Sequence, residues 1–336
     1  MTTAIAVPEP RVRSAVALRD LLWLTWRQHR WFLVGGFVLV AATTGLLLWQ
    51  AAQMRGLLPQ VQACQGGCAS GDAWRGHEDF ATNLERGGLA VIATAIAVFL
   101  GAPLVSREYE QRTHLIAWTQ DVSPGRWLVA KAAVLAVAAA GLVLVFTVGV
   151  TAVEGVREEA GADVTAFTPW EYQVFDTSAP VFLAYTLFAL ALGIAVGTLV
   201  RRTVPAMAIT FVAFAAVRLG LYFARPYFLP PLVMTQPLGE DKIEIVADRP
   251  PNSLHVESGF TDAAGNRMDG LPNLCGGTQR EWVPCLRAHG VTGYTEWLQP
   301  GSRVLLFQWM EIGFFAVFAV ALFVLAWRRV RARTVA

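Results

Sequence analysis

The sequence predicts an all-α integral membrane protein with six transmembrane helices. Of its 336 residues, 55% are hydrophobic and 15% are charged, and the mean hydropathy is +0.46. Soluble domains average about 25% charged residues, so this composition indicates a chain that lies in lipid. The apolar residues are also gathered into runs of about 20, the length that crosses a bilayer as a helix. Because a bilayer core offers no water to backbone polar groups, these runs are expected to be helices.

Six runs are long and apolar enough to span a bilayer. They are residues 31–50, 87–105, 129–153, 180–200, 204–223 and 304–327. Only Arg201, Arg202 and Thr203 separate the fourth run from the fifth, which predicts a tight hairpin. The first run follows an Arg-rich segment and has no exit site of small residues, so it is interpreted as a retained span.

Basic residues flank these spans on one side. An Arg-rich segment precedes the first span, Arg201 and Arg202 follow the fourth, and four arginines follow the sixth. With an even number of spans these clusters share one side, which the positive-inside rule makes cytoplasmic, with both termini there. The chain then divides into four parts. These are a cytoplasmic tail with an amphipathic helix (1–30), five spans (31–223), an extracellular segment (224–303), and the sixth span with a basic tail (304–336).

The segment before the first span has the pattern of an amphipathic helix. Leu18, Leu22 and Trp26 recur every four residues, and charged residues lie on the opposite face. Two interpretations remain open. The helix is either an interfacial elbow that bears on a cytoplasmic partner or a simple membrane anchor.

The extracellular segment 224–303 is the only sizeable soluble part of the chain. Six prolines exclude a long helix at its start, and residues 259–270 predict turns that link short strands. We therefore expect a small, mostly irregular external cap between the fifth and sixth spans.

The cysteines support this topology, because all four fall in segments assigned to the outside: Cys64, Cys68, Cys275 and Cys285. Disulfides persist in oxidising compartments. Of the three possible connectivities, the local pairs Cys64–Cys68 and Cys275–Cys285 are favoured, although sequence does not decide between them. A metal site is the alternative, and it would need more imidazoles than the single nearby His77.

Two charged residues fall inside predicted spans, Arg218 in the fifth and Glu311 in the sixth. Each lies about 7 to 8 residues from the outer end of its span, roughly 10–12 Å deep at 1.5 Å per residue. Charges at that depth are costly and are usually paired or functional. A structural ion pair between them is the favoured interpretation. A substrate-contacting or gating role, or an error in the span boundaries, remains open.

The loop between the second and third spans, residues 106–127, is too long for a mere connector. It is charged at its start, apolar in its middle and broken by Pro124 and Gly125. This pattern suits a docking element that receives force from a partner. The alternative is a solvated loop with local ion pairs.

The sequence carries none of the common catalytic signatures: no phosphate-binding G-x-x-x-x-G-K-[ST], no H-E-x-x-H and no G-x-S-x-G. Once six spans are set aside, too little remains for a full-sized ATPase domain. The net charge of +2 is too small to indicate nucleic-acid binding. We expect no catalytic residue, no metal, no cofactor on this chain and no nucleic-acid partner.

Three segments resemble the permease subunits of type-2 ATP-binding-cassette (ABC) transporters, in the form common in actinobacteria. They are WRQHR (26–30), EYEQRTHLIAWTQDVSPGRWLVAK (108–131) and LQPGSRVLLFQWMEIG (298–313). The middle segment is the most specific. The family typically shows Glu, two positions, Thr, then a Thr-rich turn followed by Arg and Lys, matched here by Glu110, Thr113, Thr119, Arg126 and Lys131. Arg112 departs from the family, which usually has Gly before that Thr.

The resemblance implies a dimer of six-helix permeases in membrane lipid, with a separate cytoplasmic ATPase subunit that binds ATP and Mg²⁺. It also implies an elbow helix, a coupling helix between the second and third spans, a pathway lined by the second and fifth spans, and an external loop that caps it. The residues expected to couple the chain to the ATPase are Glu108, Glu110, Arg112, Thr113, Thr119 and Arg126.

The sequence thus predicts the permease subunit of an ATP-driven exporter in the bacterial plasma membrane. Its cargo would be an amphipathic small molecule, a peptide or a lipid. The alternative from another class is a membrane sensor or immunity protein of the same fold, which binds a ligand without net transport. A second alternative is an intramembrane enzyme acting on lipid, which would need paired carboxylates or histidines within its spans.

Overall fold

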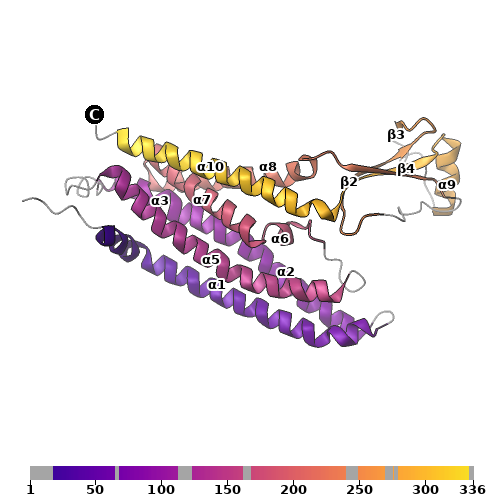
Figure 1. Cartoon of the computed structure of the whole chain (residues 1–336), viewed down its shortest axis with the longest axis horizontal. Coiled ribbons are helices and arrows are strands. Elements are labelled where there is room, and N and C mark those ends of the chain that lie inside the picture. The colour runs from indigo at the N-terminus through magenta and orange to yellow at the C-terminus, as the bar shows by residue number, and fades with distance from the viewer. Residues whose placement is uncertain are drawn as a thin grey trace, which may run out of the picture.

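The computed structural model describes residues 18–64, 68–112, 123–161, 168–239, 249–268, 275 and 279–332. The chain forms an elongated bundle of long helices, with a small sheet that extends from one end (Figure 1). The first helix begins, and the last helix ends, at the opposite end of the bundle. We call this opposite end the basic end, because the arginine clusters that flank the spans lie there, and the other the sheet end.

Six helical segments of the described chain are long and apolar enough to cross a membrane, which confirms the predicted number of spans. They are α1 (Leu18–Gln62), the run of α2 (Ala69–Ala95), η1 (Ile96–Gly101) and α3 (Ala102–Glu110), α5 (Pro124–Ala160), α7 (Ala179–Val200), α8 (Thr203–Ala224) and α10 (Val304–Ala332). Each contains one of the predicted apolar runs. At 1.5 Å per residue the 45-residue α1 is about 68 Å long, roughly twice the thickness of a hydrocarbon core. The protein is therefore an integral membrane protein whose first helices project beyond the apolar layer.

The predicted elbow helix is not a separate element in the described part of the chain. Residues 18–30 continue directly into the first span as one helix, α1. The sequence from Leu18 to Arg30 has no proline or glycine, so nothing local interrupts the helix at the expected boundary.

The tight hairpin between α7 and α8 is confirmed. Arg201 ends α7 in the left-handed conformation, at φ 58°, and its N–H donates to Gly197 O at 3.2 Å. Arg202 then takes an extended conformation and α8 begins at Thr203. Two residues therefore reverse the chain at the basic end.

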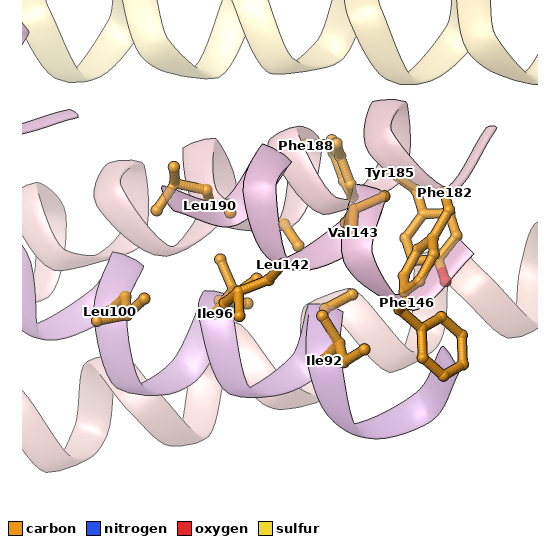
Figure 2. Packing of buried hydrophobic residues seen from close by; sticks show 14 of the residues in the cluster. Ile92, Ile96, Leu100, Leu142, Val143, Phe146, Phe182, Tyr185, Phe188 and Leu190 are labelled. Atoms are coloured by element: carbon orange, nitrogen blue, oxygen red, sulfur yellow. The ribbon is translucent and has the colours of Figure 1, made fainter. Parts of the chain in front are cut away.

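Helix α7 lies at the centre of the bundle. It packs against α10, α8, α5 and the α2–η1–α3 run, and most of its side chains are buried. Figure 2 shows the centre of this core, where residues of α7 meet Ile92, Ile96 and Leu100 of the α2–η1 run and Leu142, Val143 and Phe146 of α5. The outer surfaces of α1, α8 and α10 instead expose large apolar side chains, as expected for helices that face lipid.

Glycines let α7 approach η1 and α3 at backbone distance. A Cβ at Gly193 would lie 2.4 Å from Ala97 O, and one at Gly197 would lie 2.4 Å from Ala102 O. On the facing side, a Cβ at Gly101 would lie 2.8 Å from Leu190 O. Close approach through small residues is a common way for membrane helices to associate. The contact falls on η1, a π-helix, and such one-turn irregularities often mark hinges or functional sites.

The segment at the sheet end is more regular than the sequence predicted. It contains a four-stranded antiparallel sheet with strand order β1-β4-β2-β3. The strands are β1 (Leu232–Pro237), β2 (Leu254–Thr261), β3 (Arg267–Met268) and β4 (Gly293–Gln299), and helix α9 (Gln279–Ala288) follows β3. The expected turn within 259–270 is present, where Asp262 Oδ1 accepts hydrogen bonds from Ala264 N and Asn266 N. The expectation of a mostly irregular cap was wrong, because β4, far along the chain, pairs with both β1 and β2.

A small apolar cluster and a set of polar contacts hold this sheet in place. Phe260, Leu286 and Val291 pack together between the sheet and α9. At the other end of β4, Gln299 Nε2 donates to Pro226 O at 3.0 Å and to Leu229 O at 2.7 Å, just beyond α8. The side chain of Gln299 therefore attaches β4 to the end of the bundle.

The glycine contact gives a first prediction. Gly193→Ala should lower the stability of the protein by about 1–3 kcal/mol, because the added methyl group would overlap a carbonyl of η1. The matched control is Gly45→Ala in α1, where a Cβ would meet nothing within 4 Å. Thermal unfolding in detergent measures both variants. Equal thermal stability of the two variants would contradict the prediction, because it would show that α7 and η1 can move apart without loss of stability.

Candidate functional site

Four charged residues form a buried ionic cluster where the bundle meets the sheet. Asp176 accepts a hydrogen bond from Arg218 through Oδ2 and one from Arg225 through Oδ1, the latter at 2.5 Å. Arg225 also donates from Nε to Glu311 Oε1 at 2.6 Å. Asp176, Arg225 and Glu311 are almost fully buried, and the side chain of Arg218 is 17% exposed. We call these four residues the sheet-end cluster.

The cluster corrects the predicted pair of Arg218 and Glu311. Both residues are buried charges near the same end of the bundle, as expected, but the salt bridge of each is with another residue. Arg218 pairs with Asp176, and Glu311 pairs with Arg225. The two are joined only through Asp176 and Arg225, so the ionic network has four members in place of two.

The spacing of Arg225 from Arg218 could have indicated its role, but the fifth span was predicted to end before Arg225. Arg218 and Arg225 are seven residues apart, two helical turns, and therefore lie on the same face of the segment. The predicted span ended at residue 223, whereas α8 continues to Ala224 and a 3₁₀ turn, η2 (Arg225–Tyr227), follows it. Asp176 lies after the short helix α6 (Tyr172–Phe175), in a loop whose side chains no periodicity could assign.

Aromatic rings surround the two guanidinium groups. Arg225 Cζ lies 3.8 Å from the ring centroid of Phe175. Arg218 Cζ lies 4.4 Å from the centroid of Tyr185 and 5.9 Å from that of Phe315. Such contacts stabilise a cation most when water is excluded, as it is here.

A second buried network, which was not predicted from the sequence, joins α2 to α5. Arg157 Nη1 donates to both carboxylate oxygens of Glu85, at 3.1 and 3.0 Å, and Nη2 donates to Thr82 Oγ1 at 2.7 Å. Glu78 Oε1 lies 3.5 Å from Arg157 Nε. Glu78, Thr82 and Glu85 recur at helical spacing on one face of α2, which is the signal that could have found them. They were overlooked because they lie outside the predicted span 87–105.

At the basic end, Glu108 ties three helices together. It pairs with Lys131 of α5, whose side chain is only 3% exposed. Lys131 Nζ also donates to Gln28 Oε1 of α1 at 3.0 Å and lies 4.8 Å from the ring centroid of Trp127. The first described residues of the loop 106–127 are therefore held against α1 and α5.

Glu110 connects the same loop to α8. Its Oε2 accepts hydrogen bonds from Thr203 N at 3.0 Å and from Thr203 Oγ1 at 2.7 Å. Thr203 is the first residue of α8, so the carboxylate lies at the positive end of that helix. An acidic group from another element thus satisfies a backbone donor that the helix itself leaves free.

The other predicted coupling residues lie further along the loop. Arg112 is exposed and has a positive φ of 56°, at a position where the resembling family usually has glycine. Arg126 is exposed on the first turn of α5. Thr113 and Thr119 lie outside the described residues. Beside Arg126, a Cβ at Gly125 would lie 2.8 Å from Trp327 Nε1, so the second end of the loop abuts α10.

The cysteine pairs are the two favoured from sequence. Cys64, which follows α1, is bonded to Cys68, which precedes α2, and Cys275 is bonded to Cys285 of α9. Both bridges lie on the sheet-end side of the bundle. His289, which was not predicted from the sequence, lies beside the second bridge, with its Nδ1 3.8 Å from Cys285 Sγ and 4.0 Å from Cys275 Sγ.

These two sulfurs and His289 are the one group of possible metal ligands in the described part of the chain. Metal ligation by cysteine requires thiolates, and both sulfurs are used in a disulfide. The same Nδ1 also lies 2.9 Å from Cys285 O, which fits a ring N–H donating to that carbonyl. The arrangement therefore favours the disulfide over the metal site.

Comparison with known proteins gives one family. A family model described as "ABC-2 membrane transporter related" matches residues 37–225, more than half of the chain. The match runs from the first apolar turns of α1 to the end of α8, and so includes Glu108, Glu110 and Arg218. Neither the curated proteins nor the solved structures give a match.

The sheet-end cluster gives the second prediction. Arg225→Ala should cost about 3–5 kcal/mol of stability, because it leaves two buried carboxylates without their shared partner. Arg55→Ala is the matched control, since Arg55 pairs with Glu159 at the surface, where both side chains are more than half exposed. Its expected loss is below about 1 kcal/mol. Thermal unfolding of both variants in detergent is the measurement.

A charge exchange separates the observed cluster from a direct pair. Arg218→Glu combined with Glu311→Arg would place like charges beside Asp176 and Arg225, so it should recover none of the stability lost in the single variants. Recovery by the double variant would show that residues 218 and 311 interact directly and would contradict the four-membered cluster.

The third prediction concerns the cysteines, which should be oxidised and extracellular. A membrane-impermeant maleimide applied to intact cells should label the protein only after reduction. Labelling without reductant would contradict the disulfides, whereas labelling only after lysis would reverse the topology. A cysteine introduced at the exposed position 126, as Arg126→Cys in a background without the native cysteines, provides the cytoplasmic control.

Proposed function

The chain belongs to the ABC-2 membrane transporter related family, and from this membership we propose that it is the permease subunit of an ATP-driven exporter. As a transporter membrane subunit it is not itself catalytic. A separate cytoplasmic ATPase subunit would bind ATP and Mg²⁺ and supply the energy. The cargo would be an amphipathic small molecule, a peptide or a lipid, and two copies of the permease would form the transport unit.

The observation that carries the proposal is how the two described ends of loop 106–127 are attached. Glu108 joins the loop to α5 and α1 through Lys131, and Glu110 joins it to the start of α8. Gly125 places its other end against α10. A force applied by a partner at these two described ends would pass directly to four other spans, α1, α5, α8 and α10. A solvated loop with local ion pairs would not need these contacts with distant helices.

The π-helix η1 suggests where the second span would bend. On the side toward the basic end, α3 carries Glu108 and Glu110. On the side toward the sheet end, α2 is held to α5 by the contact of Glu85 with Arg157. Single π-helical turns inside α-helices are rare and are frequent at functional sites, so we expect the run to flex there. Because η1 also packs on the glycines of α7, bending at η1 would alter the central contact of the bundle.

The fourth prediction tests coupling. Purified without a partner, the chain should not hydrolyse ATP, whereas the complex isolated from its own cells should contain an ATPase whose rate responds to the permease. Glu110→Ala should lower that response about five-fold or more, a typical size for coupling between sites. It should still insert, fold and retain the ATPase, because Glu110 is exposed and makes its contacts at the surface.

The control is Glu159→Ala, which also removes an exposed carboxylate, together with one ion pair at the other end of the bundle. It should leave the ATPase response unchanged. ATP hydrolysis by the chain alone would refute the permease assignment. A complex that binds ligand while its ATPase rate never responds would favour a sensor over an exporter.

A further inference from the structure

Three polar groups around the sheet-end cluster have no hydrogen-bond partner. They are Ser178 Oγ, Tyr185 OH and Arg218 Nη1, and all three atoms are buried. Tyr185 is only 1% exposed as a whole residue. The guanidinium nitrogen can only donate, whereas each hydroxyl can donate or accept, so a hydrogen-bond acceptor is the one kind of group that could satisfy all three. Buried polar groups are nearly always paired, and a group of unpaired donors calls for an explanation.

Two of these donors belong to side chains in direct contact. The guanidinium of Arg218 lies 4.4 Å from the ring centroid of Tyr185, and the Tyr185 and Phe315 centroids are 5.9 Å apart. Tyr185 lies seven residues, two helical turns, after Ser178, the residue that precedes α7, so the two residues lie near the same face of that helix. Figure 2 shows Tyr185 beside Phe182, with which it packs at 5.1 Å between centroids.

The charges of the cluster decide which kind of acceptor fits. Two guanidinium groups and two carboxylates cancel one another. An anionic ligand would leave a net negative charge in a buried place, which is costly, and a cationic ligand would offer no acceptor to the free donors. An uncharged carbonyl satisfies the donors and leaves the charge balance intact.

The surroundings decide what should carry that carbonyl. Phe182, Phe214 and Phe315 all pack against the Tyr185 ring. The side chain of Arg218 is 17% exposed, beside the exposed apolar residue Leu219 of α8. A ligand would therefore approach from the lipid-facing side of α8, with its apolar body against the aromatic rings.

We propose that Tyr185 and Arg218 form a binding site for the ester or amide carbonyl of an uncharged or locally uncharged, largely apolar molecule. Tyr185 OH and Arg218 Nη1 donate to the carbonyl oxygen, and Asp176 fixes the guanidinium through its other nitrogen. Such a carbonyl occurs in the glycerol esters of bilayer lipid and in amphipathic cargo. If the occupant is cargo, the site rests on the proposed export function. If it is lipid, the site stands without it.

The test is equilibrium binding to the full-length protein in nanodiscs of diphytanyl phosphatidylcholine, a diether lipid with no carbonyl group. The probe is N-dodecanoylglycine methyl ester, and N-dodecanoylglycine and dodecylammonium are its anionic and cationic counterparts. The methyl ester should bind saturably and more tightly than either. Tyr185→Phe, which removes one hydroxyl and keeps the ring, should raise the Kd about three- to ten-fold, the effect of one hydrogen bond.

Matched variants keep the result interpretable. Tyr222→Phe removes the hydroxyl of an exposed tyrosine on α8 and should leave the Kd unchanged. Arg218→Lys keeps the charge but loses the fork of the guanidinium, and should weaken binding even if Tyr185→Phe proves unstable. No saturable binding, tighter binding of the free acid, or an unchanged Kd in both Tyr185→Phe and Arg218→Lys would overturn the proposal. The first outcome would mean that ordered water alone fills the site.

A change of lipid identifies the occupant. Diphytanoyl phosphatidylcholine has the same chains joined through esters. Weaker probe binding in these nanodiscs would show that lipid carbonyls compete for the site, and unchanged binding would show that the site prefers a cargo-like molecule. Both results support the site, and neither depends on ATP hydrolysis or on transport.

Discussion

The close contact of α7 with η1 and α3 is the constraint on which the rest of the bundle depends. Lipid tails are as apolar as the side chains of a helix, so apolar burial gives membrane helices little preference for one another, and shape complementarity decides. Glycines at 193 and 197 bring the two backbones to within contact distance. Once α7 is held there, its remaining faces receive α5, α8 and α10, and the other spans pack around these.

Charge placement fixes the two ends of this bundle. At the sheet end, Arg225 joins Asp176 and Glu311, which come from the loop before α7 and from α10. At the basic end, Lys131 and Glu110 connect the loop after α3 to α1, α5 and α8. The centre holds aromatic and aliphatic side chains. Ionic contacts therefore specify which helix ends meet, while glycines and rings specify how closely the middles pack.

The sheet-end cluster shows how one set of residues can serve both structure and binding. Each oxygen of Asp176 accepts a hydrogen bond from one arginine, whereas Arg218 still has a free nitrogen and Tyr185 a free hydroxyl. Each charged group of the cluster therefore has an opposite charge beside it, while one guanidinium nitrogen and one neutral hydroxyl remain unpaired. These donors lie next to α8, one of the spans that faces lipid. An amphipathic molecule could therefore reach them from the bilayer.

The sequence by itself determined the number of spans and their positions to within a few residues at the hairpin between α7 and α8, and it favoured both cysteine pairs without deciding between the possible connectivities. Those features depend on properties that are local along the chain: runs of apolar residues, a short basic turn, and cysteines four and ten residues apart. It also identified Arg218 and Glu311 as charges that need partners, because a charge among apolar residues is visible without a structure. Glu108 and Glu110 were found from the resemblance and from the polarity of their loop.

The tertiary structure alone decided which groups those charges meet. Asp176 and Arg225 lie beyond predicted span ends, and only the packing of α7, α8 and α10 brings them beside Arg218 and Glu311. The π-helix and the pairing of β4 with strands on both sides likewise depend on contacts between distant segments. Local periodicity reports which face of an element is apolar. It does not report which neighbour that face will meet, because many partners offer lipid-like surfaces of equal hydrophobicity.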